Sequence, residues 1–156
     1  MLRQRARPVT EITDVHRRLI ADMIDTMREA PGVGLAATQV GVVERIFVWE
    51  VGEEHGVIIN PEIVERGSET ETQDEGCLSL PGLLFPVERA LDVVVEGLDE
   101  NGQEVRIEAS ELQARVFQHE LDHLNGVLFI DHLSDEDRRA ARAALMEQAL
   151  GLRPSG

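Results

Sequence analysis

The spacing of apolar residues predicts the first helix of the chain. Apolar side chains recur about every 3.6 residues, the period of an amphipathic helix, over the segment that precedes Pro31 and Gly32. Thr10 or Thr13 can cap the start of this helix, and the proline and glycine end it. The predicted buried face consists of Ile12, Val15, Leu19, Met23 and Met27.

Runs of β-branched and aromatic residues predict strands in the middle of the chain. The two last strands are joined across residues 99–102 (DENG), a hairpin loop in which the glycine supplies the unusual φ. The segment 32–41 (GVGLAATQVG) contains too much glycine for a plain helix or strand and is interpreted as a shaped loop. The predicted strands cover residues 44–50, 56–65, 90–98 and 103–109.

A second helix carries the residues on which the functional argument depends. It begins at Ser110, which fits a capping box with Gln113, and it ends at Asn125 and Gly126. Because this helix is apolar on two sides, we expect it to be buried in the middle of a domain. One stripe contains Leu112, Val116, His119 and His123, a second contains Phe117, Leu121 and Leu124, and a polar stripe contains Glu111, Arg115, Gln118, Asp122 and Asn125.

A third helix is predicted from Ser134 to Gly151, with an alanine-rich face that packs on the surface. The elements together predict an α+β fold, in which small antiparallel β-sheets pack around the central helix that carries the two histidines. A length of 156 residues is typical of one domain, so we expect a single domain over residues 1–156 and a monomer.

Composition limits the partners and the compartment. A net charge of −15 disfavours DNA, RNA or an anionic membrane as the main partner of the chain. The single cysteine, Cys77, allows no intramolecular disulfide, which favours a reducing compartment. The first residues lack the apolar core of a signal peptide, and no apolar run reaches the ~18 residues that span a bilayer. A cytoplasmic protein is therefore expected.

The stretch QHELDHLNG, residues 118–126, has the form of a metal-hydrolase helix. His119 and His123 are four residues apart and project from the same side of the helix, where both can bind one metal ion. Glu120 flanks that site and is placed to handle the protons of a bound water. A third ligand must come from elsewhere in the chain, and the downstream candidates are Asp131, His132, Glu136 and Glu147.

An alternative third ligand lies upstream, in EGCLSLPG at residues 75–82. A lone cysteine is more often a small core residue, but Gly76 before Cys77 and Pro81 and Gly82 after it indicate a specially shaped turn. A thiolate with two imidazoles suits a divalent first-row metal and leaves one coordination position open for chemistry.

Three segments resemble the signature motifs of the peptide deformylase family, in the order of that family. They are GVGLAATQ at 32–39, EGCLS at 75–79 and QHELDH at 118–123. LRQRARPV near the start and GVLFIDHLS at 126–134 extend the resemblance over nearly the whole chain. Family members usually carry a further short stretch before the first of these two segments. The resemblance implies a metallohydrolase that removes the N-formyl group from formylmethionine of nascent peptides and releases formate.

The resemblance also implies the metal site and its acid/base. Cys77, His119 and His123 would bind one divalent metal ion per chain, and Glu120 would act as general base and general acid. Ferrous iron is the metal in many family members, with zinc, nickel or cobalt as substitutes in purified protein. Ligand type alone does not select among these metals.

Further roles follow from the same resemblance. The side-chain amide of Gln39 and the backbone N–H of Leu78 would stabilise the developing oxyanion. Glycines near the substrate path would let its backbone approach closely, an apolar pocket would hold the methionine side chain, and an arginine would lie near that path. The candidates for these substrate contacts are Gly32, Val33, Gly34, Arg89, Leu112 and Val116.

Other interpretations stay open. In the first interpretation the chain is an N-formylmethionyl peptide deformylase. In the second it is a zincin-type metallopeptidase, and Cys77 does not bind the metal. In the third it is a catalytically inactive relative that serves as a binding module. Arg138, Arg139 and Arg142 of the third helix are candidates for a transient contact with ribosomal RNA.

Overall fold

The computed structural model describes residues 5–29, 32–75, 84–127, 135–137, 139, 140, 142 and 143. The chain divides into two compact units, and each is described by itself. The first unit comprises residues 1–70 and 89–127, and the second comprises residues 71–88 and 128–156. The expectation of a single domain over residues 1–156 stays a prediction.

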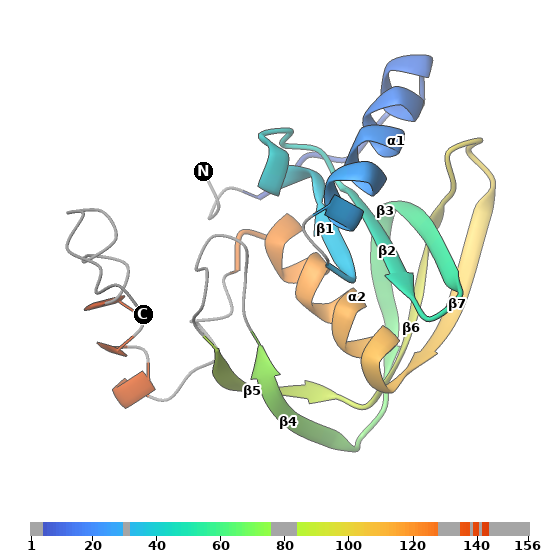
Figure 1. The fold of residues 1–156 in the computed structure, drawn as a ribbon. Helices are drawn as coiled ribbons and strands as arrows, with labels where there is room; N and C mark the ends of the chain where they lie inside the picture. Colours follow the sequence, from blue (N-terminus) through green and yellow to red (C-terminus); the bar gives the residue numbers. More distant parts are fainter. Residues whose placement is uncertain are drawn as a thin grey trace. The chain divides into compact units, whose positions relative to one another are not determined.

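A five-stranded antiparallel sheet forms the centre of the first unit (Figure 1). Helix α2 (Glu111–Leu124) packs on this sheet and contacts strands at both edges of the sheet. Helix α1 (Asp14–Glu29) contacts the first two strands of the sheet. The order of the strands is β1 (Gly34–Ala36), β2 (Ile46–Val51), β3 (Glu54–Arg66), β6 (Asp92–Leu98) and β7 (Glu104–Ser110). The expected α+β fold, with antiparallel strands packed against the helix that carries the histidines, is confirmed.

The second unit contains most of a two-stranded sheet that the sequence did not predict. Its strands are β4 (Thr70–Glu75) and β5 (Phe85–Ala90). The β4 sequence, TETQDE, is polar and largely exposed, so it lacks the apolar alternation that announces a strand. The described residues of the predicted third helix, 135–137, 139, 140, 142 and 143, are helical. No helix in the described part of the chain is long and apolar enough to cross a membrane.

Two apolar clusters lie on the two faces of the five-stranded sheet, because successive side chains of a strand point to opposite faces. Phe47 and Trp49 of β2 pack with Phe117 of α2, at ring-centroid distances of 5.5 and 5.4 Å. Val48 lies between Phe47 and Trp49 in the sequence, and it belongs with Met23 of α1 to the cluster on the other face of the sheet. The two helices therefore cover opposite faces of the same strand.

Three local expectations were wrong. Val15 is 65% exposed, and Ile20 takes the buried place on α1. The segment 32–41, which we interpreted as a shaped loop, contains strand β1 and the 3-10 helix η1 (Ala37–Val40). Ser110 makes no side-chain cap on α2, because its hydroxyl donates to Asp92 Oδ1 at 2.6 Å.

Candidate metal centre and active site

Helix α2 brings two imidazoles to one point. The Nε2 atoms of His119 and His123 are 3.2 Å apart, and the ring centroids are 4.9 Å apart. Two nitrogens that bind one tetrahedral metal ion at ~2.0–2.1 Å would be separated by about 3.3 Å. His123 is buried and His119 is half-buried. The donor type and the spacing of these nitrogens therefore fit a metal ion.

The third ligand predicted from the sequence, Cys77, lies outside the described residues, as does Leu78. Among the residues that the structure describes, no group of three or more His, Cys, Asp or Glu side chains forms a metal site. Of the downstream candidates, Asp131, His132 and Glu147 also lie outside this part. The choice of Cys77 as ligand thus stays a prediction from the motif.

Glu120 is held against the backbone of β1. Its side chain is only 4% exposed, on the turn of α2 that also carries the histidines. A Cβ atom added to Gly34 would lie 2.7 Å from Glu120 Oε2 and 2.9 Å from Val116 Cγ1, closer than real Cβ contacts. Only glycine lets strand and helix approach so closely at this position. The structure therefore brings Gly34, Val116 and Glu120 together, as the sequence predicted for one site.

Gln39 lies in η1, where its amide has a defined orientation. The backbone N–H of Ala36 donates to Gln39 Oε1 at 2.9 Å. An NH₂ group cannot accept a hydrogen bond, so the atom that faces the Ala36 N–H must be the amide oxygen of Gln39. The amide nitrogen, Nε2, therefore lies on the opposite side and can only donate. The next residue but one, Gly41, ends η1 with a φ of 84°. The bond from Ala36 thus fixes the orientation of the Gln39 amide, and the role of Gln39 in catalysis stays a prediction.

The predicted substrate contacts differ in their exposure and in the bonds that they make. Val33 and Leu112 are large apolar side chains that stay 43% and 48% exposed, available for a ligand. Val116 is buried one turn after Leu112, against Gly34. Gly32 donates its N–H to the Met27 carbonyl at 2.9 Å and closes the end of α1.

Arg89, the last of these candidates, is buried and forms an ion pair with Asp122 of α2. Its Nη1 donates to Asp122 Oδ2. A substrate contact would therefore have to use the other nitrogens of this guanidinium. The structure thus shows Arg89 first of all as a link between α2 and the end of β5.

Gln118 is a residue whose importance the sequence did not reveal. Its Nε2 donates to the Ala90 carbonyl at 2.8 Å, and its Oε1 accepts from the Ala90 N–H at 3.0 Å. Gln118 and Asp122 belong to the predicted polar stripe, yet Gln118 is 3% exposed. The signal was present in QHELDH, where these two residues directly precede the two histidines. The polar stripe of α2 therefore fastens this helix to Ala90 through Gln118 and to Arg89 through Asp122.

Comparison with known proteins identifies the family. A family model described as polypeptide deformylase matches residues 1–139. The chain belongs to this family. Peptide deformylases from Halothermothrix orenii and Acidothermus cellulolyticus are 55% and 50% identical, over 84% and 94% of this chain and 86% and 81% of theirs. The solved peptide deformylase of Legionella pneumophila is 42% identical with a TM-score of 0.88, over 98% of this chain and 93% of that one.

Membership in the deformylase family confirms three expectations from the sequence: the family itself, an enzyme of the hydrolase class, and the α+β fold. Deformylases are metal-dependent, which agrees with the convergent histidines of α2. The roles of individual residues stay predictions.

Proposed function

We propose that this enzyme hydrolyses the formamide bond of N-formylmethionine at the start of newly synthesised peptides and releases formate. The observation that carries the proposal is the convergence of His119 and His123 Nε2 at 3.2 Å beside buried Glu120. Family membership gives this arrangement its substrate class.

His119 and His123 would hold the metal ion together with Cys77 of the EGCLS motif. A bound divalent ion lowers the pKa of water and polarises a carbonyl oxygen, so it supplies hydroxide at neutral pH. We propose ferrous iron as the ion in vivo, with zinc, nickel or cobalt as substitutes. A set of two imidazoles and one thiolate accepts all four.

Glu120 is the proposed general base and general acid. It would take the proton of the attacking water and deliver it to the amine that leaves, which becomes the free N-terminus of the peptide. Its position supports this role, since the carboxylate is buried close to Gly34 of β1. Restricted placement of such a group contributes typically ~10²–10⁴ in rate.

Gln39 would stabilise the negative charge that develops on the formyl oxygen. The Ala36 N–H holds Oε1 of the amide, so Nε2 is oriented as a donor before substrate arrives. Removal of one such donor typically costs ~3 kcal/mol in the transition state. The Leu78 N–H is proposed as the second donor on the basis of the motif.

The methionine side chain would lie on the apolar surface formed by Val33, Leu112 and Val116. Val33 and Leu112 are 43% and 48% exposed and can therefore contact a ligand. Gly32 and Gly34 would let the peptide backbone approach the protein.

The proposal is tested by release of formate from formyl-Met-Ala-Ser, with protein purified without oxygen. The variant Glu120→Gln keeps the shape of the side chain but removes the base, and we expect activity to fall by about 10²–10⁴. Glu108→Gln, an exposed carboxylate of β7, is the matched control and should keep full activity.

The outcomes also separate the competing interpretations. Loss of both metal and activity in Cys77→Ser supports the deformylase site, whereas retention of both favours a zincin-type peptidase. No formate from wild-type protein that holds one metal ion per chain would indicate an inactive relative.

The remaining expectations accompany this proposal. We propose a cytoplasmic monomer with one catalytic domain, whose substrate is the nascent peptide and which binds no DNA and no membrane. We also propose a transient contact of Arg138, Arg139 and Arg142 with ribosomal RNA, although the chain as a whole carries a net charge of −15.

A further inference from the structure

A pocket lined by three arginines lies in the first unit, at the end of α2. Its volume is about 210 Å³, and its walls come from the N-terminal segment, the residue before β2, the second half of β3 and the last turn of α2. None of the residues that line it belongs to the proposed metal, catalytic or substrate-binding set. The pocket is therefore a feature of the fold that the proposed function does not explain.

The three guanidinium groups come from segments that are far apart in the sequence. Arg45 precedes β2, Arg66 ends β3, and Arg5 lies near the start of the chain. The segment that carries Arg5 is held against α2, because the N–H of Ala6 donates to the Leu124 carbonyl at 2.7 Å. Tertiary contacts thus bring the three cations to one pocket.

Arg45 is half-buried, and two of its nitrogens are fixed. Its Nη1 donates to the Leu124 carbonyl at 3.3 Å, and its Nη2 donates to Asn125 Oδ1 at 2.9 Å. Both acceptors are neutral, so these bonds orient the guanidinium without neutralising its charge. Burial lowers the pKa of Arg45, and the positive charge of Arg5 lowers it further. A negative ligand beside Arg45 would offset both effects.

The protein itself does not neutralise these arginines. Among the residues that the structure describes, no carboxylate forms an ion pair with Arg5, Arg45 or Arg66. Two carboxylates line the same pocket, but that of Asp122 pairs with Arg89, and Glu62 is exposed. The cations therefore stay uncompensated in a chain that has 30 acidic and 15 basic residues.

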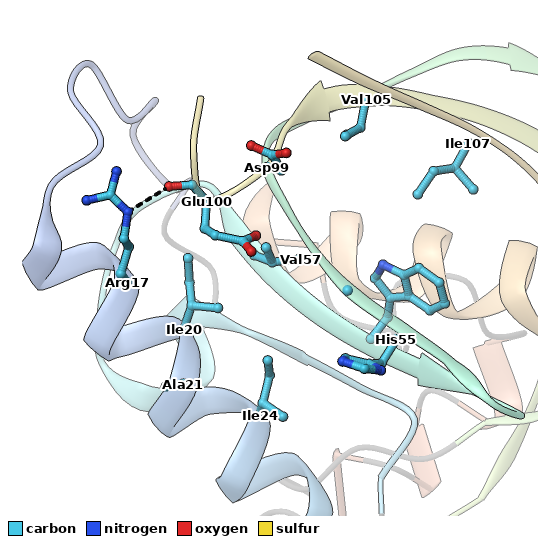
Figure 2. Close-up of a pocket in the computed structure, with 12 residues that line it drawn as sticks. Arg17, Ile20, Ala21, Ile24, His55, Val57, Asp99, Glu100, Val105 and Ile107 are labelled. Atoms are coloured by element: carbon cyan, nitrogen blue, oxygen red, sulfur yellow. Dashed lines mark hydrogen bonds between the residues drawn. The ribbon is translucent and has the colours of Figure 1, made fainter. Parts of the chain in front are cut away.

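Arg17 shows the contrasting case. It lines a larger cavity between α1 and two hairpins, where its Nε donates to the Glu100 carbonyl at 3.1 Å (Figure 2). Its Nη1 also forms an ion pair with Asp14 at 2.7 Å. The guanidinium in that cavity is thus already satisfied by the protein, whereas those around the smaller pocket can still bind an anion.

The charge and the size of the smaller pocket favour one small oxyanion. Guanidinium groups bind phosphate oxygens through paired N–H donors, and three positive charges favour a phosphate dianion over a carboxylate with a single charge. A polyanion such as RNA would also meet the rest of the surface, and the net charge of −15 would repel it. We propose that the pocket between Arg5, Arg45 and Arg66 binds the phosphate group of a small molecule.

The test is a calorimetric titration of the metal-loaded protein with inorganic phosphate, at an ionic strength kept constant with sodium chloride. We expect saturable binding that Arg5→Gln weakens about tenfold, the typical effect of one charge-assisted hydrogen bond. Arg7→Gln is the matched control, since it removes an exposed arginine of the same segment that does not line the pocket. Equal affinities of the two variants would overturn the proposal, because phosphate would then bind elsewhere, for example at the metal.

A second variant changes the affinity in the opposite direction. Glu62→Gln removes a carboxylate from the wall and should tighten phosphate binding about two- to fivefold. Glu104→Gln, an exposed carboxylate of β7 outside the pocket, should leave the affinity unchanged. Binding that responds equally to both substitutions would show a general effect of net charge and would overturn the site.

A short single-stranded RNA tests the other source of phosphate groups. Binding of this RNA that is tighter than that of inorganic phosphate and is lost in Arg5→Gln would overturn the assignment to a small molecule. Formate release by Arg5→Gln should equal that of wild type, because the pocket is independent of the deformylase reaction. Failure of this proposal is thus distinguishable from failure of the proposed function.

Discussion

Substitution of Gly34 by alanine should displace the proposed catalytic carboxylate without changing any charged group. The φ of Gly34 is not in the left-handed region, so alanine can adopt the backbone conformation. The added Cβ would lie 2.7 Å from Glu120 Oε2, 2.9 Å from Val116 Cγ1 and 3.0 Å from Glu120 Cγ. The helix side chains must therefore move away from β1.

The size of the effect follows from these distances. Ordinary van der Waals contact begins at 3.4 Å, so the Glu120 carboxylate must move by about 0.7 Å. A displacement of about 1 Å at a catalytic group typically lowers the rate by ~10², and extra atoms in a packed core cost ~1–3 kcal/mol. We therefore expect kcat for formate release to fall about 100-fold, with a loss of stability that leaves the protein folded.

Wild-type protein is the reference. Formate release under saturating formyl-Met-Ala-Ser and the free energy of unfolding in urea are measured for Gly34→Ala and for wild type. A kcat of Gly34→Ala within twofold of the wild-type value would refute the argument that β1 positions Glu120.

Three other predictions concern stability and ionisation. Gln118→Leu should lower the free energy of unfolding by about 2–4 kcal/mol, because it leaves the N–H and C=O of Ala90 without their side-chain partner; an unchanged urea midpoint would contradict this. The hydrogen bond from Arg28 holds the pKa of the Glu50 carboxyl below its usual range. The pair therefore stabilises the fold at pH values above the ordinary carboxyl pKa, and this stabilisation is lost as the pH falls through the lowered pKa of Glu50. Arg28→Gln should therefore raise the Glu50 pKa measured by NMR titration, and a constant value would disprove the link. Removal of the metal by a chelator should lower stability by about 2.7 kcal/mol relative to protein with free metal at 100 times its Kd, and calorimetry should show no such difference for His123→Ala.

The sequence predicted the parts of this protein that depend on neighbours in the chain. The period of apolar residues located α1 and α2, and β-branched runs located β2, β3, β6 and β7. The convergence of His119 and His123 was also predictable, since residues four apart share one side of any helix. Order and type of the motifs were enough to recognise the family.

Patterns failed where burial depends on a partner far away in the sequence. Val15 fits the apolar period of α1 but stays 65% exposed. Gln118 fits a solvent-facing stripe but is buried, because its partner Ala90 comes from a strand 28 residues earlier. The polar strand β4 escaped prediction for the same reason, since its pairing with β5 does not require an apolar face.

The sequence by itself therefore determined the helix that carries the histidines, the main strands and the chemical type of the site. Only the tertiary structure decided that Glu120 packs against Gly34, that Gln118 and Asp122 fasten α2 to Ala90 and Arg89, and that three arginines from separate segments line one pocket. The physical reason is that periodicity reports which side of an element avoids water. Which atoms meet there is set by contacts between segments that are distant in the chain.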